Sequence, residues 1–305
     1  MRLESLDVLR GFDLFCLVVL ETTLHPLAHA LDSETFNRFM WCFTHVDWEG
    51  FSSWDLVMPL FLFMTGITIP FSLSAVKRDK TYPRLPIYKR ILKRFIILWI
   101  FGMICQGNLL GLDPTRIYLY SNTLQSIALG YLVSSILFIN LKTSVQIVIS
   151  IMLLIIYWAI MQFASIEGYG SGDYTPTANF AEWVDRVVLG RFRDMATFSA
   201  DGTVQFAPWY NYTWIVSSLN FVVTVMSGMF AGIILKSANF TANKKFKLLL
   251  FIGVALVVVG YILGFVHPII KKLWTSSMTF YSSGWCYILM ALFYWIIDVK
   301  GCKKH

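Results

Sequence analysis

Long apolar runs recur along the chain and are separated by shorter polar segments. Each run has about twenty residues, which matches the hydrocarbon thickness of a bilayer at a helical rise of about 1.5 Å per residue. Only helices satisfy all their own backbone hydrogen bonds within one lipid-embedded segment, so the runs predict an all-α, polytopic transmembrane helix bundle. The expected spans, about eight, are residues 9–28, 55–75, 91–110, 118–140, 145–163, 214–236, 247–266 and 274–298.

Two of the polar segments are long enough to carry structure of their own. Residues 29–54 are acidic and aromatic. Residues 164–213 combine a stretch rich in glycine, proline and threonine with an amphipathic pattern over Asn179–Leu189, which predicts a short helix inside a long loop. No internal repeat is visible, which removes one support for an inverted-repeat transporter. Residues 1–305 are expected to form a single membrane domain.

The charge distribution orients the bundle. Only 14% of the residues are charged and 57% are hydrophobic, too little charge to cover a soluble domain of this size. With the N-terminus in the cytoplasm, 18 of the 25 Lys and Arg residues fall in cytoplasmic segments, as the positive-inside rule requires. The net charge of +7 is therefore a topology signal. We expect the lipid bilayer, and no nucleic acid, as a partner.

Polar side chains in the spans converge on the outer leaflet. Glu21 and His25, four residues apart on one helix face, lie near the outer end of the first span. His45, Trp48 and Asp55 lead into the second span from the outside. The third and fourth spans add amides at the same level, namely Gln106, Asn108, Asn122 and Gln125. Polar groups are expensive in a membrane, so this convergence predicts a functional site at the outer face.

Structural interpretations of these residues remain open. His45 could cap the second helix, and the helix macrodipole alone would favour Asp55 in its first turn. The amides could join helices by hydrogen bonds, and the tryptophans, including Trp48, suit an interfacial belt. Glu21 is harder to explain, because a carboxylate inside a span needs a partner, a proton or water.

The cations near the inner face also allow two interpretations. Arg10 and Asp13, three residues apart, suit a structural ion pair. Eight cations between Lys77 and Arg94 are either a topology determinant or an anion clamp for a phosphorylated cytosolic ligand.

Familiar soluble-enzyme motifs are missing. The sequence contains no G-x-G-x-x-G, Walker, H-E-x-x-H or G-x-S-x-G motif, so nucleotide hydrolysis and soluble-type hydrolase chemistry have no support. The five cysteines show no metal-ligand spacing, and no metal is expected. A histidine beside a carboxylate can serve as a general base toward an amine or hydroxyl.

Three segments resemble the heparan-α-glucosaminide N-acetyltransferase family, in particular a bacterial inner-membrane branch: RLESLDVLRGFDLF, HVDWEGFSSWDLVMPLFLFMTGITIPFS and HPIIKKLWTSSMTFYSSGWCYILMALFYWIIDVKG. The resemblance implies that acetyl-CoA is taken from the cytosolic side and that acetyl is delivered to an amino sugar outside. It assigns the catalytic histidine to His45. The family's basic opening of the third helix matches Arg90, Lys93 and Arg94, and its fourth-helix glutamine matches Gln125.

The chain departs from the family pattern at three places. Glu21 stands where the lysosomal enzyme has an asparagine. Gln125 is followed by Ser126 instead of an arginine. Relatives continue through further helices where this sequence stops at DVKGCKKH, so the chain is expected to be a fragment or a short form lacking those helices.

The sequence hypothesis is therefore a membrane-bound acyltransferase. His45 would be the general base or a transient acyl acceptor, with Glu21 and Asp55 orienting it. Substrate would be bound by Trp48, Asn108, Asn122 and Gln125, and the phosphates of CoA by Arg10, Arg90, Lys93 and Arg94. The main alternative is a permease for N-acetylglucosamine or a related sugar, and a third is a scaffold without a ligand. A homodimer is left open.

Overall fold

The computed structural model describes residues 3–20, 22–24, 26–27, 33–79 and 81–301. Glu21 and His25 lie outside these ranges. The long helices are α1 (Glu4–Phe15, continuing as π-helical turns Cys16–Leu20), α4 (Val57–Arg78, after a 3-10 turn Ser53–Leu56), α5 (Arg84–Cys105), α6 (Thr123–Asn140), α7 (Thr143–Phe163), α9 (Ser218–Lys236), α10 (Ala242–Gly264) and α11 (Ser276–Phe293, continuing as π-helical turns Tyr294–Val299).

The shorter elements lie in the connections. Two short helices are α3 (Glu34–Met40) and α8 (Phe180–Leu189). Two hairpins form from β1 (Ser165–Ile166) with β2 (Tyr169–Gly170), and from β3 (Ala196–Phe198) with β4 (Val204–Phe206). The short helix predicted from the amphipathic pattern is confirmed as α8. The Asn179 side chain begins it by accepting a hydrogen bond from the Glu182 N–H at 2.8 Å.

The helical membrane bundle predicted from the apolar runs is confirmed. Six helical segments within the described ranges are long and apolar enough to cross a membrane: Ser53–Arg78, Thr123–Asn140, Thr143–Phe163, Ser218–Lys236, Ala242–Gly264 and Ser276–Val299. The predicted third span is helical but starts earlier, at Arg84, and its first half is strongly basic. The predicted first span is helical over Glu4–Leu20, and part of it lies outside the described residues.

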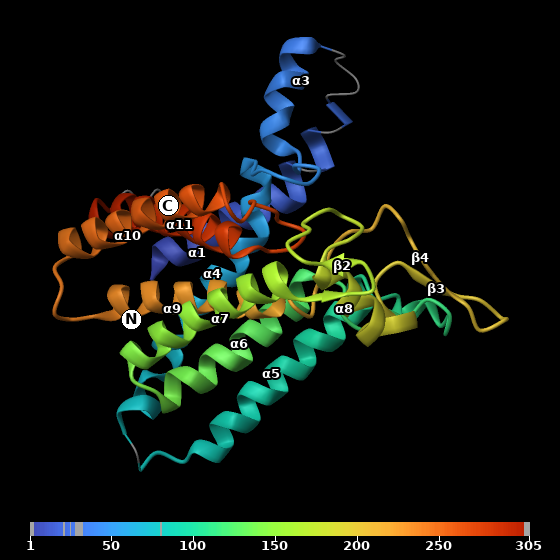
Figure 1. The fold of residues 1–305 in the computed structure, drawn as a ribbon. Coiled ribbons are helices and arrows are strands. Elements are labelled where there is room, and N and C mark those ends of the chain that lie inside the picture. Colours follow the sequence, from blue (N-terminus) through green and yellow to red (C-terminus); the bar gives the residue numbers. More distant parts are fainter. Residues whose placement is uncertain (1–2, 21, 25, 28–32, 80, 302–305) are drawn as a thin grey trace.

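Helices α4 and α9 form the centre of the bundle. Figure 1 shows α5, α6 and α7 on one side of this pair and α1, α10 and α11 on the other. One hydrophobic core joins α4 and α9 to α5 and α6, and it includes Leu62, Ile127 and Phe221. A second core joins the same two helices to α1, α10 and α11, and it includes Leu9 and Phe63. Helix α4 therefore contributes to both cores.

Glycines allow the backbones of α4 and α9 to touch. A methyl group at Gly66 of α4 would overlap the carbonyl oxygen of Val225. A methyl group at Gly228 of α9 would overlap the carbonyl oxygen of Phe63. Small residues at helix crossings are how membrane helices pack closely, because lipid supplies no hydrophobic drive between them.

We expect Gly66→Ala to destabilise the bundle, since the added methyl would push α4 and α9 apart; overpacking typically costs about 1–3 kcal/mol. The matched control is Gly11→Ala on α1, where a Cβ would meet nothing within 4 Å. Because alanine is the better helix former by about 1 kcal/mol, the control should keep or raise the melting temperature in detergent. Equal melting temperatures for the two variants would contradict the close-packing interpretation.

Candidate active site

Asp55 and His45 form a hydrogen-bonded pair where the chain enters α4. Asp55 Oδ1 lies 2.8 Å from His45 Nδ1, and the Asp55 side chain is 1% exposed. Its other oxygen accepts hydrogen bonds from the backbone N–H of Ser52 at 3.0 Å and from the Ser52 hydroxyl at 3.1 Å. Since an ionised carboxylate can only accept, His45 Nδ1 carries a proton and donates it to Asp55, which leaves Nε2 as the nitrogen that can accept.

Lys271 completes this pair. Its Nζ lies 3.2 Å from Asp55 Oδ1 and 3.4 Å from His45 Nε2, and its side chain is 10% exposed. Nζ is also 2.9 Å from His45 Nδ1. With the Nδ1 proton engaged by Asp55, the ammonium donates to the carboxylate and lies close to Nε2. The three side chains thus place a buried acid, an imidazole and a cation around one point.

Backbone contacts between segments 219 and 221 positions apart in the sequence bring Lys271 to this place. The Gly50 N–H donates to the Ile269 carbonyl at 2.9 Å, and Glu49 forms an antiparallel bridge with Ile270. The Trp274 N–H donates to the Lys271 carbonyl at 2.9 Å, which closes the turn before α11. The segment before α4 and the loop before α11 are therefore fixed to each other.

His267 holds the same loop against α11. The Ser276 N–H donates to His267 Nε2 at 3.0 Å. Nδ1 therefore carries the ring proton and donates it to the Tyr174 hydroxyl oxygen at 2.9 Å. Burial lowers the pKa of His267 to about 4, because a charged ring would lose its hydration. His267 is thus a neutral structural residue with both nitrogens in use.

The His45 cluster faces a cavity of about 660 Å³. Its polar wall holds His45, Lys271, Asn122, Tyr210 and Tyr212. The remaining wall is mainly apolar, with contributions from α1, α4 and α6. A cavity of this size beside a histidine–carboxylate pair is large enough for a sugar and an acyl group.

Of the predicted amide residues Asn122 and Gln125, only Asn122 lines the cavity. Asn122 lines the cavity, and its side chain also begins α6 by accepting from the Leu124 N–H at 2.9 Å. Gln125 is fully buried; it accepts from the Ser121 N–H at 2.8 Å and donates to the Leu119 carbonyl at 2.6 Å. Gln125 therefore braces the entry to α6. A contact of Gln125 with substrate stays a prediction.

The other predicted substrate residues lie outside the cavity lining. Asn108 takes a left-handed backbone conformation with φ 54° at the end of α5. Trp48 donates its indole N–H to the Tyr174 carbonyl at 2.9 Å, and so helps to fix the long loop. Glu21 lies outside the described residues, and its role stays a prediction.

The four predicted CoA-binding cations do not line the described cavity. Arg10 pairs with Asp7 at 3.6 Å, whereas the sequence suggested Asp13. The guanidinium of Arg94 packs over the Tyr131 ring at 4.2 Å. Arg90 and Lys93 are exposed on α5. At about 1.5 Å per residue, Arg90 is about 24 Å along α5 from Gln106 at the cavity.

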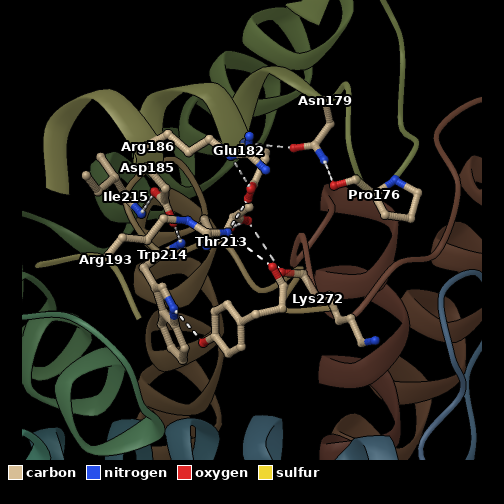
Figure 2. A network of polar contacts seen from close by, with 12 residues as sticks. Pro176, Asn179, Glu182, Asp185, Arg186, Arg193, Thr213, Trp214, Ile215 and Lys272 are labelled. Carbon is tan, nitrogen blue, oxygen red and sulfur yellow. Dashed lines mark hydrogen bonds and ion pairs between the residues drawn. The ribbon is translucent and has the colours of Figure 1, made fainter. Parts of the chain in front are cut away.

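A buried polar network in the long loop supports the aromatic wall of the cavity (Figure 2). Asp185 of α8 accepts hydrogen bonds from the backbone N–H groups of Trp214 at 2.7 Å and Ile215 at 3.0 Å. Burial raises the pKa of Asp185 to about 7, and the two N–H donors limit that rise. Trp214 in turn donates its indole N–H to the Tyr210 hydroxyl at 3.2 Å. Trp214 and Tyr210 both line the cavity.

The same network reaches the loop that carries Lys271. The Thr213 N–H donates to the Lys272 carbonyl at 3.1 Å. Glu182 pairs with Arg186 at 2.8 Å and also with the buried Arg193. Sequence reasoning missed Lys271 and this network. The visible signals were a cation just outside the last span and the acids on the polar face of the amphipathic helix.

We expect stability to fall as the pH is lowered from about 6.5 toward 4, because an unfolded His267 takes up a proton that the folded one resists. The lowered folded pKa corresponds to about 3 kcal/mol across that window. His267→Gln keeps a donor and an acceptor but does not titrate, so its melting temperature should depend less on pH than that of the wild type. Parallel pH profiles of the two proteins between pH 7.5 and 4.5 would contradict this role.

Comparison with known proteins gives a distant but nearly full-length similarity. No family model matches the chain. It is 25% identical to human (Homo sapiens) heparan-alpha-glucosaminide N-acetyltransferase over an alignment of 348 positions that includes 98% of this chain and 49% of the human protein. It is 24% identical to the mouse (Mus musculus) protein of the same name, over 86% of this chain and 46% of that protein. The chain spans about half the length of these curated relatives. The similarity supports a membrane acetyltransferase in general.

Proposed function

We propose that this protein is a multi-pass acetyltransferase, of a bacterial inner membrane, that moves acetyl from cytosolic acetyl-CoA to an amino sugar or another carbohydrate at the outer face. The observation that carries the proposal is the His45–Asp55–Lys271 cluster, which opens on a cavity between membrane helices. The similarity to two acetyltransferases that act on a glucosaminide supports the reaction class.

In the direct mechanism His45 Nε2 takes the proton of the acceptor amine while the amine nitrogen attacks the thioester carbonyl carbon. A C–N bond forms, the C–S bond breaks, and the proton passes from Nε2 to the departing thiolate. Asp55 holds the ring in the tautomer that leaves Nε2 free and stabilises the imidazolium. In the alternative, Nε2 attacks the thioester carbonyl, the C–S bond breaks and CoA leaves as the thiolate. The acceptor amine then attacks the acetyl group, the bond from the acetyl carbon to Nε2 breaks, and the amine proton passes to the thiolate.

Lys271 has an electrostatic role in either mechanism. Its ammonium lies 3.2 Å from Asp55 Oδ1 and balances the buried charge of that carboxylate. It also lies close enough to Nε2 to donate to the oxyanion that forms when the carbonyl carbon becomes tetrahedral. This combination of a base and an oxyanion donor supports acyl transfer.

The permease hypothesis is less well supported. A permease must pass its sugar to the opposite face, and α4 and α9 touch through their backbones at Gly66 and Gly228, which leaves no room for a sugar between these two helices. The exposed Arg90 and Lys93 on the opposite end suit the phosphates of CoA, for which a sugar permease has no use.

We expect His45→Ala to lower the rate of acetyl transfer by about 10²–10⁴, the usual contribution of a general base. CoA binding should be nearly unchanged, because the nucleotide end binds at the other face. Transfer of labelled acetyl to glucosamine and equilibrium binding of CoA are the two measurements. The protein should be purified in its longest natural form.

The neighbouring cations provide a matched pair for the same assay. Lys271→Met should lose about 10²-fold in rate, as removal of one oxyanion donor does. Lys272→Met should change little, because Lys272 Nζ lies over the Tyr212 ring at 5.8 Å and not beside His45. For the His45→Ala variant described above, a decrease in the transfer rate of less than about tenfold would assign His45 to helix capping.

A separate prediction concerns the donor. The double variant Arg90→Gln/Lys93→Gln should weaken CoA binding and reduce its dependence on salt, since exposed cations act on phosphates through screened charge. Arg84→Gln is the control, because its guanidinium donates to the Asn140 side chain at 3.2 Å. If the double variant and the wild type bind CoA with equal affinity, and both are correctly inserted, then Arg90 and Lys93 serve only to orient the protein in the membrane.

A further inference from the structure

The cavity beside His45 changes character with depth. At the end that holds His45 its wall is polar and aromatic. Farther along the helices the lining becomes apolar; this aliphatic part consists of Phe61 and the aliphatic side chains of Leu14, Leu17, Val57, Met58, Leu124 and Ile127. Phe61 follows Asp55 by six residues, so the aliphatic part reaches about 9 Å into the membrane along α4. The cavity thus has a polar head and a hydrocarbon-like body.

The aliphatic part lies between two helices on opposite flanks of α4. Helix α1 supplies Leu14 and Leu17 and packs on α4 and α11. Helix α6 supplies Leu124 and Ile127 and packs on α4, α5 and α9. Figure 1 shows α1 with the α10–α11 group and α6 on the other side of α4. Leu14 and Leu17 are 49% and 40% exposed, so this side of the cavity is open at the surface of the described helices.

We propose that the acceptor is an amino sugar carried on a lipid chain, which enters from the bilayer between α1 and α6. This inference rests on the proposed function. The sugar lies among Tyr210, Tyr212 and Asn122 with its amine at His45, and the chain lies along the aliphatic part. A free sugar would make no apolar contact with that wall, whereas a hydrocarbon chain covers it.

The pantetheine arm of CoA fits the aliphatic part less well. That arm contains amide groups, and a buried amide without a hydrogen-bond partner costs free energy. The seven side chains that line the aliphatic part offer no donor or acceptor. A hydrocarbon chain needs none, so the aliphatic part suits the lipid of the acceptor, and the thioester of the donor would meet His45 at the polar end of the cavity.

Photocrosslinking and kinetics together test this inference on the full chain in phosphatidylcholine nanodiscs. The crosslinking probe is a dodecyl glucosaminide with a diazirine in the middle of its alkyl chain, and the short-chain acceptor is methyl glucosaminide. We expect crosslinks in peptides that contain Leu17, Phe61 and Ile127. We also expect KM to be at least tenfold lower for dodecyl than for methyl glucosaminide.

Two tryptophan variants on the same helical segment provide the control. Leu17→Trp should fill the aliphatic part, reduce labelling of these peptides at least fivefold and remove the KM advantage of dodecyl over methyl glucosaminide. Val18→Trp should behave as wild type, because Val18 is 60% exposed and does not line the described cavity. The two variants have the same bulk and the same effect on partitioning of the probe into the bilayer.

The outcomes separate this inference from the proposed function. Suppose that the probe labels the cavity peptides, that Leu17→Trp abolishes this labelling, and that no acetyl transfer is seen. This result supports the lipid-linked ligand and refutes the transferase. Acetyl transfer with equal KM for both acceptors overturns the inference and leaves the transferase in place. Labelling spread over the lipid-facing side chains of α7 and α10, or labelling that CoA displaces but unlabelled dodecyl glucosaminide does not, also overturns it.

Discussion

The backbone contact between α4 and α9 determines the positions of the cavity residues that these two helices carry or that lie just before them. Asp55 lies in the first turn leading into α4, and Trp214 lies in the segment leading into α9, so a displacement of one helix against the other changes the width of the cavity. Gly66 and Gly228 permit the contact because they carry no side chain at the crossing. In a bilayer such packing, rather than burial from water, holds helices together. The geometry of the site therefore depends on two residues with no functional groups.

The loops at the face that bears His45 convert this helix packing into side-chain geometry. The segment before α4 bonds to the loop before α11 through Gly50 and Ile269, and the segment before α9 bonds to the same loop through Thr213 and Lys272. Three chain segments far apart in sequence are thereby tied around Lys271. Buried polar groups of this kind are costly unless every partner is present, which makes the arrangement rigid once it forms.

Sequence reasoning predicted the elements well and the site only in part. Apolar length identified the helices because the bilayer imposes it, and polar residues near helix ends pointed to His45, Asp55 and Asn122. Lys271 was missed because it is 226 positions from His45, and its charge also fits a loop outside the last span. Gln125 shows the opposite difficulty. In the sequence alone, an amide that binds a substrate cannot be distinguished from one that braces a turn. The contacts of Gln125 show that it braces the entry to α6.

The electrostatics of the cluster explain why such chemistry suits a membrane face. An isolated carboxylate at the depth of Asp55 would be costly, and its two Ser52 donors, the α4 dipole and Lys271 share its charge. Lys271 balances the charge of Asp55 within this cluster. In the proposed mechanism the proton that His45 gains is transient and is carried by Nε2, while Asp55 holds Nδ1. A reaction that creates and then removes one charge on His45 would need little rearrangement of the side chains around it.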